Sequence, residues 1–214
     1  MKVLVVTVNY RTPELAVRCL QSLEHEVKQI GDMHVVVTEN HSGDDSVEVI
    51  SGAIDAHGWD WCTLLPQERN GGYGAGNNAG MGPYLHGKDA PEYVMLVNPD
   101  AYVREGAIGA MLEFMESRPD VGIAGARVED GNGKQAQSAF RFPSAWSELV
   151  EGFKLGVLTK LLDDRQLLVE LGDEPMPVDW VTGAAVMFRS EVLEQVGLFD
   201  EGFFLYFEEV DLCF

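Results

Sequence analysis

The sequence predicts an α/β protein built on a mainly parallel central sheet, with helices flanking both faces. Strand-like and helix-like segments alternate through the first hundred residues, an order that requires crossover connections between parallel strands. The strand-like segments are nearly continuous apolar runs, as expected of strands that are buried on both faces. Toward the C-terminus the alternation becomes less regular, and we expect a smaller mixed β region there.

The expected elements follow in order along the chain. Thr12 and Pro13 mark the start of the first helix, because threonine is a good N-cap and proline is tolerated at the first helical position. Strands are expected at 2–8, 33–38, 61–65, 93–97, 121–128 and 178–188, and helices at 13–27, 46–56, 77–85, 105–117 and 190–197. A turn is expected at 129–134, a weak helical pattern covers 149–162, and the first turns of a helix begin at 208.

Charge and cysteine content limit the classes of function. Lys+Arg 15 against Asp+Glu 35 gives a net charge of -20, which argues against a nucleic-acid partner and also suits a high-salt environment. An anionic ligand would therefore have to be bound by a metal ion or by backbone N–H groups. Cys19, Cys62 and Cys213 show no metal-binding spacing, which predicts reduced thiols in a cytoplasmic protein. No apolar run is long enough for a membrane helix, and the opening segment is too short for a signal peptide.

Polar residues gather where the expected parallel strands end, which is where ligands bind in such sheets. Glu39 can accept hydrogen bonds from a nucleobase or a ribose, or it can simply cap a turn. Asp100 follows the apolar run 93–97 in the sequence Asn-Pro-Asp. Its carboxylate is a candidate ligand for Mg²⁺ or Mn²⁺, and the alternative is an ordinary turn at the end of a strand.

The segment "ERNGGYGAGNN" (68–78) is rich in glycine, and we expect Asn77 and Asn78 to open the helix that follows it. Glycines allow a close backbone approach, and a helix N-terminus offers free N–H groups to anionic oxygens. The segment matches neither a Walker loop nor a strict dinucleotide-binding fingerprint. A flexible surface loop is the alternative.

A second acidic cluster lies near the C-terminus. Glu201, Glu208, Glu209 and Asp211 are interleaved with aromatic residues in "DEGFFLYFEEVDLCF". Carboxyl groups among aromatic rings can have raised pKa values and act as general bases, whereas the alternative is the solvated face of an amphipathic helix.

Taken in order, five blocks of the sequence resemble the family 2 glycosyltransferases with the GT-A fold, in particular their rhamnosyltransferase-like branch. The blocks are "VVTVNYRTPELAVRCLQSL", "VVVTENHSGDDS", "ERNGGYGAGNNAGM", "YVMLVNPDA" and "VDWVTGAAVMFRSEVLEQVGLFDEGFFLYFEEVDLCF". Together they cover essentially the whole chain. The resemblance implies a single GT-A domain over 1–214, with a nucleotide-binding half (1–104) and an acceptor-side half (105–214) that we expect to be shortened at its C-terminus.

The resemblance also assigns roles to individual residues. It places Thr7, Asn9, Arg11 and Glu39 around the nucleotide, with Glu39 at the position where the family usually has a base-pairing aspartate. It places Asn70, Gly71, Gly72, Gly76 and Asn77 near the ribose and diphosphate, Asn98 and Asp100 at the metal-binding D-x-D motif, and Trp180, Gly183 and Ala184 in the sugar and acceptor pocket. Glu209 corresponds to the catalytic base, and Glu208 remains the alternative.

The function implied is inverting transfer of a sugar from a nucleotide-diphosphate donor to a hydroxyl of a glycan or lipid-linked acceptor, assisted by Mg²⁺ or Mn²⁺. A dTDP-sugar, with rhamnose as the first candidate, or a UDP-sugar is the expected donor, and peripheral association at the inner face of the membrane would fit a lipid-linked acceptor. The alternative from another class is a shortened nucleotide-sugar-binding module with little or no transferase activity. A sugar-phosphate nucleotidyltransferase is disfavoured, because "TVNYRTPEL" carries no glycine-rich loop after the first strand. The sequence does not indicate the oligomeric state.

Overall fold

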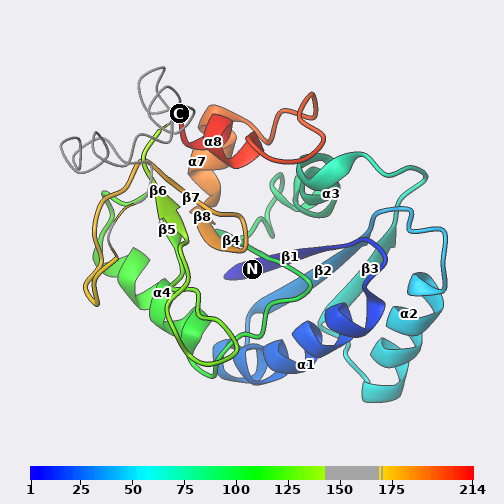
Figure 1. The fold of residues 1–214 in the computed structure, drawn as a ribbon. Coiled ribbons are helices and arrows are strands. Elements are labelled where there is room, and N and C mark those ends of the chain that lie inside the picture. The colour runs from blue at the N-terminus through cyan, green and yellow to red at the C-terminus, as the bar shows by residue number, and fades with distance from the viewer. Residues whose placement is uncertain (143–168, 170) are drawn as a thin grey trace.

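The computed structural model describes residues 1–142, 169 and 171–214, so the expected helix at 149–162 lies outside the described residues. Its central element is a six-stranded sheet with the strand order β3-β2-β1-β4-β8-β5, and β6 and β7 form a separate two-stranded sheet. Figure 1 shows the central sheet between two layers of helices. The predicted α/β class, with a mainly parallel sheet flanked on both faces, is therefore confirmed.

The first half of the chain supplies the parallel part of the sheet. It consists of β1 (Val3–Asn9), α1 (Pro13–Ile30), β2 (Met33–Glu39), α2 (Ser46–His57), β3 (Cys62–Pro66) and β4 (Tyr93–Val97), each within a few residues of its predicted range. β1 pairs in parallel with both β2 and β4, and β2 pairs in parallel with β3. This register places Asn9 directly beside Glu39 at the carboxyl end of the sheet.

The second half adds antiparallel pairing at the other side of β4. It consists of α4 (Ala107–Ser117), β5 (Ile123–Gly125), β6 (Ala139–Phe140), β7 (Trp180–Val181), β8 (Ala185–Arg189), α7 (Ser190–Val196) and α8 (Glu208–Cys213). β8 runs antiparallel between β4 and β5, so the C-terminal half completes the sheet begun by the first half.

Two predicted strands differ from the structure. The single strand expected at 178–188 is two strands, because the chain pairs first with β6 and then turns at 182–184 to pair with β4. The strand expected at 121–128 is only three residues long, since its partner β8 begins at Ala185, to which Ala126 makes the last hydrogen bond. The turn expected at 129–134 is present, closed by an antiparallel bridge between Glu129 and Gln135.

The glycine-rich segment was predicted to be a loop that ends where Asn77 opens a helix, and this prediction is wrong. α3 spans Gly72–Met81 and is followed by a short 3-10 helix, η1 (Gly82–Tyr84). The glycines are needed for packing against β1. A Cβ on Gly76 would lie 2.8 Å from Val8 Cγ1, and one on Gly80 would lie 2.5 Å from Val6 Cγ1.

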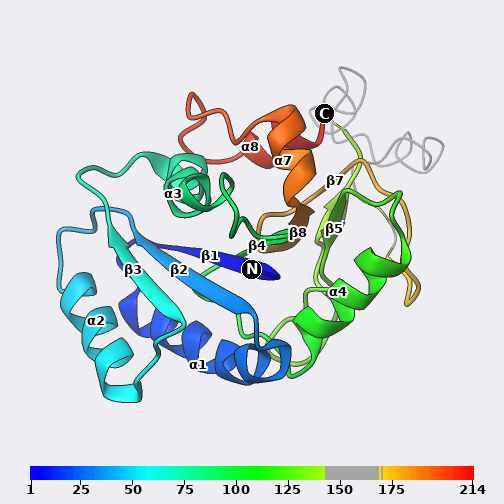
Figure 2. The ribbon, with the colours of Figure 1, turned by 180° about the vertical axis from the view of Figure 1, so that it is seen from behind.

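The two faces of the sheet carry separate apolar cores. α1, α2 and α4 cover one face, and α3, α7 and α8 cover the other, as the opposite views in Figures 1 and 2 show. Alternate residues of β1 divide between them: Val3 and Val5 pack toward the first group, whereas Leu4 and Val6 pack toward the second. This alternation explains why the strands are apolar throughout.

α4 begins beside a buried carboxylate from α1. Glu26 is fully buried and accepts hydrogen bonds from the backbone N–H groups of Gly106 (2.5 Å) and Ile108 (2.9 Å). These are free donors of the first turn of α4, and a negative charge there is favoured by the helix dipole. Glu26 thus ties α4 to α1 on one face of the sheet.

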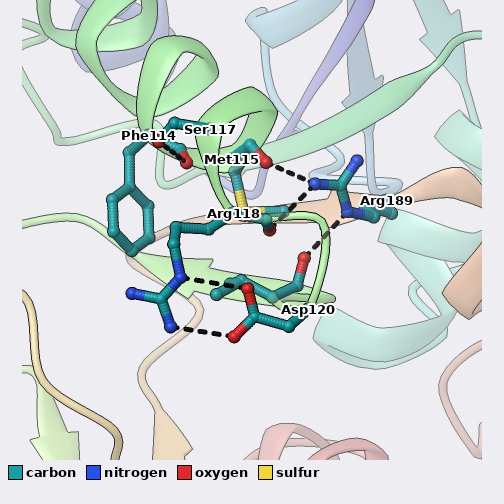
Figure 3. Close-up of polar contacts among 7 residues, drawn as sticks. Phe114, Met115, Ser117, Arg118, Asp120 and Arg189 are labelled. Carbon is teal, nitrogen blue, oxygen red and sulfur yellow. Dashed lines mark hydrogen bonds and ion pairs between the residues drawn. The ribbon is translucent and has the colours of Figure 1, made fainter.

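The C-terminal end of α4 is held by Arg189, the last residue of β8 (Figure 3). The guanidinium donates to the carbonyls of Met115, Arg118 (3.2 Å) and Val121 (2.8 Å). These carbonyls belong to the last turn of α4 and the segment after it, where a positive charge is favoured. Arg118 itself pairs with Asp120 at the exposed surface.

Candidate active site

The carboxyl ends of β1 and β2 are joined by Ser42. Its backbone N–H donates to Glu39 Oε1 at 2.9 Å, and its hydroxyl donates to the same oxygen. Arg11, which has a φ of 59°, donates its backbone N–H to Ser42 Oγ (2.9 Å) and its Nε–H to the Ser42 carbonyl (3.1 Å). The structure thus brings Arg11 and Glu39 together. Ser42 was not predicted to take part, because no spacing pattern distinguishes it from an ordinary turn serine.

Asn40 connects this strand end to the start of α3. Its Nδ2 donates to Asn70 Oδ1 (3.0 Å) and to the Gly72 carbonyl (2.9 Å), and its Oδ1 accepts the Gly71 N–H at 3.4 Å. Asn70, Gly71 and Gly72 are therefore held to Asn40, the residue that follows Glu39 in the chain. The sequence placed Asn40 at a strand tip but gave it no such bridging role.

Thr7 and Asn9 lie further inside the protein. Both are fully buried, and within the described residues Thr7 Oγ1 and Asn9 Nδ2 have no hydrogen-bond partner. Asn9 Oδ1 accepts a 3.3 Å hydrogen bond from the Thr12 hydroxyl. Asn9 ends β1 beside Glu39, Thr7 lies two residues earlier in the strand, and both side chains are buried in this structure.

Gly76 and Asn77 are buried within α3 and do not open it. Asn77 Nδ2 donates to the Tyr73 carbonyl at 3.1 Å, one turn earlier in the helix, and Gly76 contacts Val8 as described above. The close backbone approach that the sequence predicted at Gly76 is therefore made to β1. Among the glycines predicted to bind the donor, Gly71 and Gly72 stand at the N-terminus of α3, where free N–H groups lie.

A second cluster joins the C-terminal segment to the tip of β4. The Gly183 N–H donates to Glu209 Oε1 at 3.2 Å, and the Ala184 carbonyl accepts the Asn98 N–H at 3.0 Å. The Tyr73 hydroxyl donates to the Gly183 carbonyl at 2.8 Å. Residues from four distant parts of the sequence thus meet. Four of these residues were predicted site members: Asn98 of the donor site, and Gly183, Ala184 and Glu209 of the acceptor and catalytic segments.

The two candidate bases differ in environment. Glu208 has an exposed fraction of 1%, and its Oε2 has no hydrogen-bond partner within the described part of the chain. Burial raises the pKa of Glu208, and the neighbouring charge of Glu209 raises it further. Glu209 is only partly buried, and one of its oxygens accepts the Gly183 N–H. Glu209 is therefore the carboxylate that a ligand can reach.

Asp100 is exposed just after β4, and Asn98 and Pro99 before it are half-buried. In the described ranges no group of three or more His, Cys, Asp or Glu side chains lies close enough to form a preformed metal site. Mg²⁺ and Mn²⁺ in phosphate-binding sites commonly use one or two protein carboxylates and take the remaining ligands from phosphate and water. An exposed Asp100 fits a cation of this kind.

Trp180 lies on β7, which packs against α8, the helix that carries Glu209. Its ring stacks on Phe140 with centroids 4.3 Å apart, and its indole N–H donates to the Arg141 carbonyl at 3.0 Å. The structure therefore places Trp180 on the small sheet that leads into the site.

The sequence matches the family model described as "Glycosyl transferase family 2" over residues 3–196. The chain belongs to this family. It is 31% identical over 160 residues to an N-acetylglucosaminyl-diphospho-decaprenol L-rhamnosyltransferase of Mycobacterium tuberculosis, a match that covers 70% of this chain and 51% of the relative. The chain thus spans about half the length of the curated relative it matches. The expected family is confirmed, and the expected resemblance to its rhamnosyltransferases is borne out by this relative.

Solved structures show the same fold at low sequence identity. TarS residues 1–349 of S. aureus superpose with a TM-score of 0.63 at 15% identity, covering 100% of this chain and 54% of that 1–349 chain. The mannosyltransferase PcManGT of Pyrobaculum calidifontis, solved with GDP-Man and Mn²⁺, gives a TM-score of 0.58 at 15% identity, covering 94% of this chain and 48% of that protein. These matches support the GT-A fold. None of the helices in the described ranges is both long and apolar enough to cross a membrane.

Proposed function

We propose that this chain binds a nucleotide-diphosphate sugar and transfers the sugar, with inversion, to a hydroxyl of a glycan or lipid-linked acceptor. The observation that carries the proposal is the chain of contacts from Glu209 through Gly183 and Ala184 to Asn98, which sets a carboxylate beside the tip of β4 in a family 2 glycosyltransferase. Membership of the family supports sugar transfer in general. The inversion and the identity of the base are inferred from this arrangement.

The donor would lie across the carboxyl ends of β1, β2 and β4. Glu39 and the 70–72 segment would bind the base and ribose, with Arg11 as the nearby cation for the diphosphate. A bound Mg²⁺ or Mn²⁺, held by Asp100 with support from Asn98, would neutralise negative charge on the departing diphosphate. Arg11 and the divalent cation would supply positive charge to an anionic ligand, although the net charge of the chain is -20.

In the transfer step, the acceptor oxygen attacks the anomeric carbon while the bond from that carbon to the diphosphate oxygen breaks. Glu209 accepts the proton of the acceptor hydroxyl as the new bond forms. Its hydrogen bond from Gly183 occupies one carboxylate oxygen and leaves the other for that proton. Gly183 and Ala184 would line the sugar and acceptor pocket, with Trp180 at its approach, and Glu208 remains the alternative base.

The names of the relatives support our choice of donor sugar and acceptor. The mycobacterial relative is named as an L-rhamnosyltransferase acting on a diphospho-decaprenol, which favours a dTDP-rhamnose donor and a lipid-linked acceptor. TarS has been solved with UDP, which keeps UDP-sugars as the second candidate. We place the chain in the cytoplasm, peripherally at the inner face of the membrane, where a lipid-linked acceptor presents its polar head.

Calorimetric titration tests the donor site. We would titrate dTDP, UDP and GDP, each with and without Mn²⁺, into wild type, Asp100→Ala and Asp60→Ala. Asp60 is a matched control, because it is exposed and precedes β3, at the opposite end of the parallel strands from Asp100. We expect metal-dependent binding of one nucleotide by wild type and Asp60→Ala, and its loss in Asp100→Ala.

Absence of binding for every nucleotide, with the circular dichroism of a folded protein, would refute the donor site. If one nucleotide binds, transfer of sugar from the corresponding donor would be measured, with a short-chain N-acetylglucosaminyl-diphospho-lipid as the acceptor. Binding without transfer or donor hydrolysis would favour the alternative of a nucleotide-sugar-binding module.

A further inference from the structure

Tyr73 stands between two segments that carry the proposed chemistry. It lies in the first turn of α3, and its hydroxyl donates to the Gly183 carbonyl at 2.8 Å. On the other side of the same residue, the Gly183 N–H donates to Glu209 Oε1 at 3.2 Å. The two hydrogen bonds flank the Gly183 Cα and so fix the backbone of that residue between Tyr73 and Glu209.

The fit around Gly183 is close. A Cβ on Gly183 would lie 2.5 Å from the Tyr73 hydroxyl oxygen and 3.0 Å from Glu209 Oε1. Glycine at this position therefore allows the phenol and the carboxylate to approach the same residue. Ala184, the next residue, accepts the Asn98 N–H, so the segment held by Tyr73 also contacts the tip of β4.

Glu209 has little local support of its own. It lies in the first turn of α8, which is six residues long, and the preceding Tyr206 and Phe207 both have left-handed backbones with φ of 68° and 71°. Such conformations are unfavourable for non-glycine residues and persist only when surrounding contacts enforce them. The position of Glu209 must therefore be set by tertiary contacts.

Tyr73 supplies contacts on both sides of this strained segment. Its backbone N–H donates to the Phe204 carbonyl at 3.1 Å, and its hydroxyl reaches Gly183. Burial raises the pKa of Tyr73, and the charges of Glu209 and Glu208 raise it further. The phenol is thus a permanent donor over the working pH range, which a hydrogen bond to a carbonyl requires.

We propose that Tyr73 is a positioning residue, which holds Gly183 so that Glu209 stays aimed at the acceptor hydroxyl. This inference rests on the proposed function for its catalytic consequence, whereas the linkage itself is a property of the fold. Tyr73 does not contact the reacting atoms. It acts through Gly183.

A double-mutant cycle tests the proposal. We would measure kcat and the donor KM for transfer from dTDP-rhamnose, or from the UDP-sugar if UDP is the nucleotide bound, in wild type, Tyr73→Phe, Glu209→Gln and the double variant. Tyr84→Phe is the matched control, because this half-buried tyrosine lies in η1 and its ring is tilted against that of His34, with centroids 5.8 Å apart. Exchange of the Gly183 amide proton, followed by NMR, gives a readout independent of activity.

We expect Tyr73→Phe to lower kcat about tenfold, the effect of one lost hydrogen bond, and to leave donor KM within about twofold. In the Glu209→Gln background the same change should cause no further loss, because the hydroxyl acts only through that carboxylate. The Gly183 amide should exchange about tenfold faster in Tyr73→Phe and be unchanged in Tyr84→Phe.

Three outcomes separate the hypotheses. An equal loss of kcat in both Glu209 backgrounds, or an effect confined to KM, would overturn the positioning role while leaving the transferase intact. Unchanged Gly183 exchange in Tyr73→Phe would overturn the linkage. If the Gly183 amide exchanges faster in Tyr73→Phe than in wild type, but the wild-type chain neither binds nucleotide nor transfers sugar, the linkage is upheld and the proposed function is overturned, and with it the catalytic consequence of Tyr73.

Discussion

Replacement of Gly76 by alanine distinguishes packing from donor binding as the reason for glycine in α3. The added Cβ would lie 2.8 Å from Val8 Cγ1 and 3.1 Å from Val8 Cγ2, so rotation of the valine cannot relieve both contacts. Overpacking of this kind costs about 1–3 kcal/mol. Alanine is favoured over glycine inside a helix by about 1 kcal/mol, which offsets part of this cost.

Gly52→Ala is the matched control for this prediction. Gly52 lies inside α2, and a Cβ there would have no neighbour within 4 Å. Because the helix-propensity gain is common to both variants, their free energies of unfolding should differ by the packing cost alone, about 1–3 kcal/mol, with Gly76→Ala the less stable. Urea unfolding measures the difference. Equal stability of the two variants, with nucleotide binding lost only in Gly76→Ala, would refute the packing explanation and restore the predicted approach to the diphosphate.

Three further predictions concern stability. Arg189→Met should lower the free energy of unfolding by about 2 kcal/mol, because it leaves the carbonyls at the end of α4 without their donor. Arg118→Met, the control, should change it by less than about 0.5 kcal/mol. Urea unfolding compares the two variants. Glu208 has a raised pKa in the folded chain, so its stabilising contribution is present below its ordinary pKa of 4.5 and is lost as pH rises through the folded value. Glu208→Gln should therefore be more stable than wild type at pH 7 and not at about pH 4, and an equal gain at both pH values would contradict the burial argument. With a net charge of -20, the melting temperature should rise between about 0.05 M and about 1 M KCl as repulsion is screened, and a flat profile would show that repulsion is unimportant.

The sheet could be predicted because its sequence pattern and its physical environment agree. β1, β2 and β4 are buried on both faces, and their apolar runs leave few alternatives to a parallel arrangement covered by helices. The break at 182–184 could not be predicted in the same way. β7 and β8 each continue an apolar pattern, and the switch between partners depends on where β6 and β4 lie in space.

α3 shows where local preference gives the wrong answer. Its four glycines each disfavour a helix by about 1 kcal/mol relative to alanine, so the sequence favours a loop. The structure overrides this preference, because only glycine lets the helix approach β1 at Gly76 and Gly80 and the backbone of Phe204 at Gly72. A single sequence does not distinguish a glycine needed for flexibility from one needed for close packing.

In the candidate site, too, the residues that local sequence places differ from those that distant contacts place. The positions of Glu39, Asn98 and Asp100 could be predicted, because Glu39 ends a buried strand, the other two follow one, and parallel strands bring their carboxyl ends together. Asn40 and Tyr73 could not, since each acts through partners far away in the sequence. A phenol that donates to a carbonyl 110 residues later has no spacing that would distinguish it from any other tyrosine at a helix start.

These contacts give α3 a structural role on both of its sides. One side packs against β1 through Gly76 and Gly80, directly below the strand tips proposed to bind the donor. The other side holds the C-terminal segment, where Asn78 exchanges two hydrogen bonds with the Phe199 backbone (2.9 and 3.1 Å) and Tyr73 holds Gly183. The proposed donor and acceptor sides therefore share one rigid helix. It follows that a substitution which shifts α3 on β1 should also move Glu209, although no residue of β1 contacts that carboxylate in the described structure.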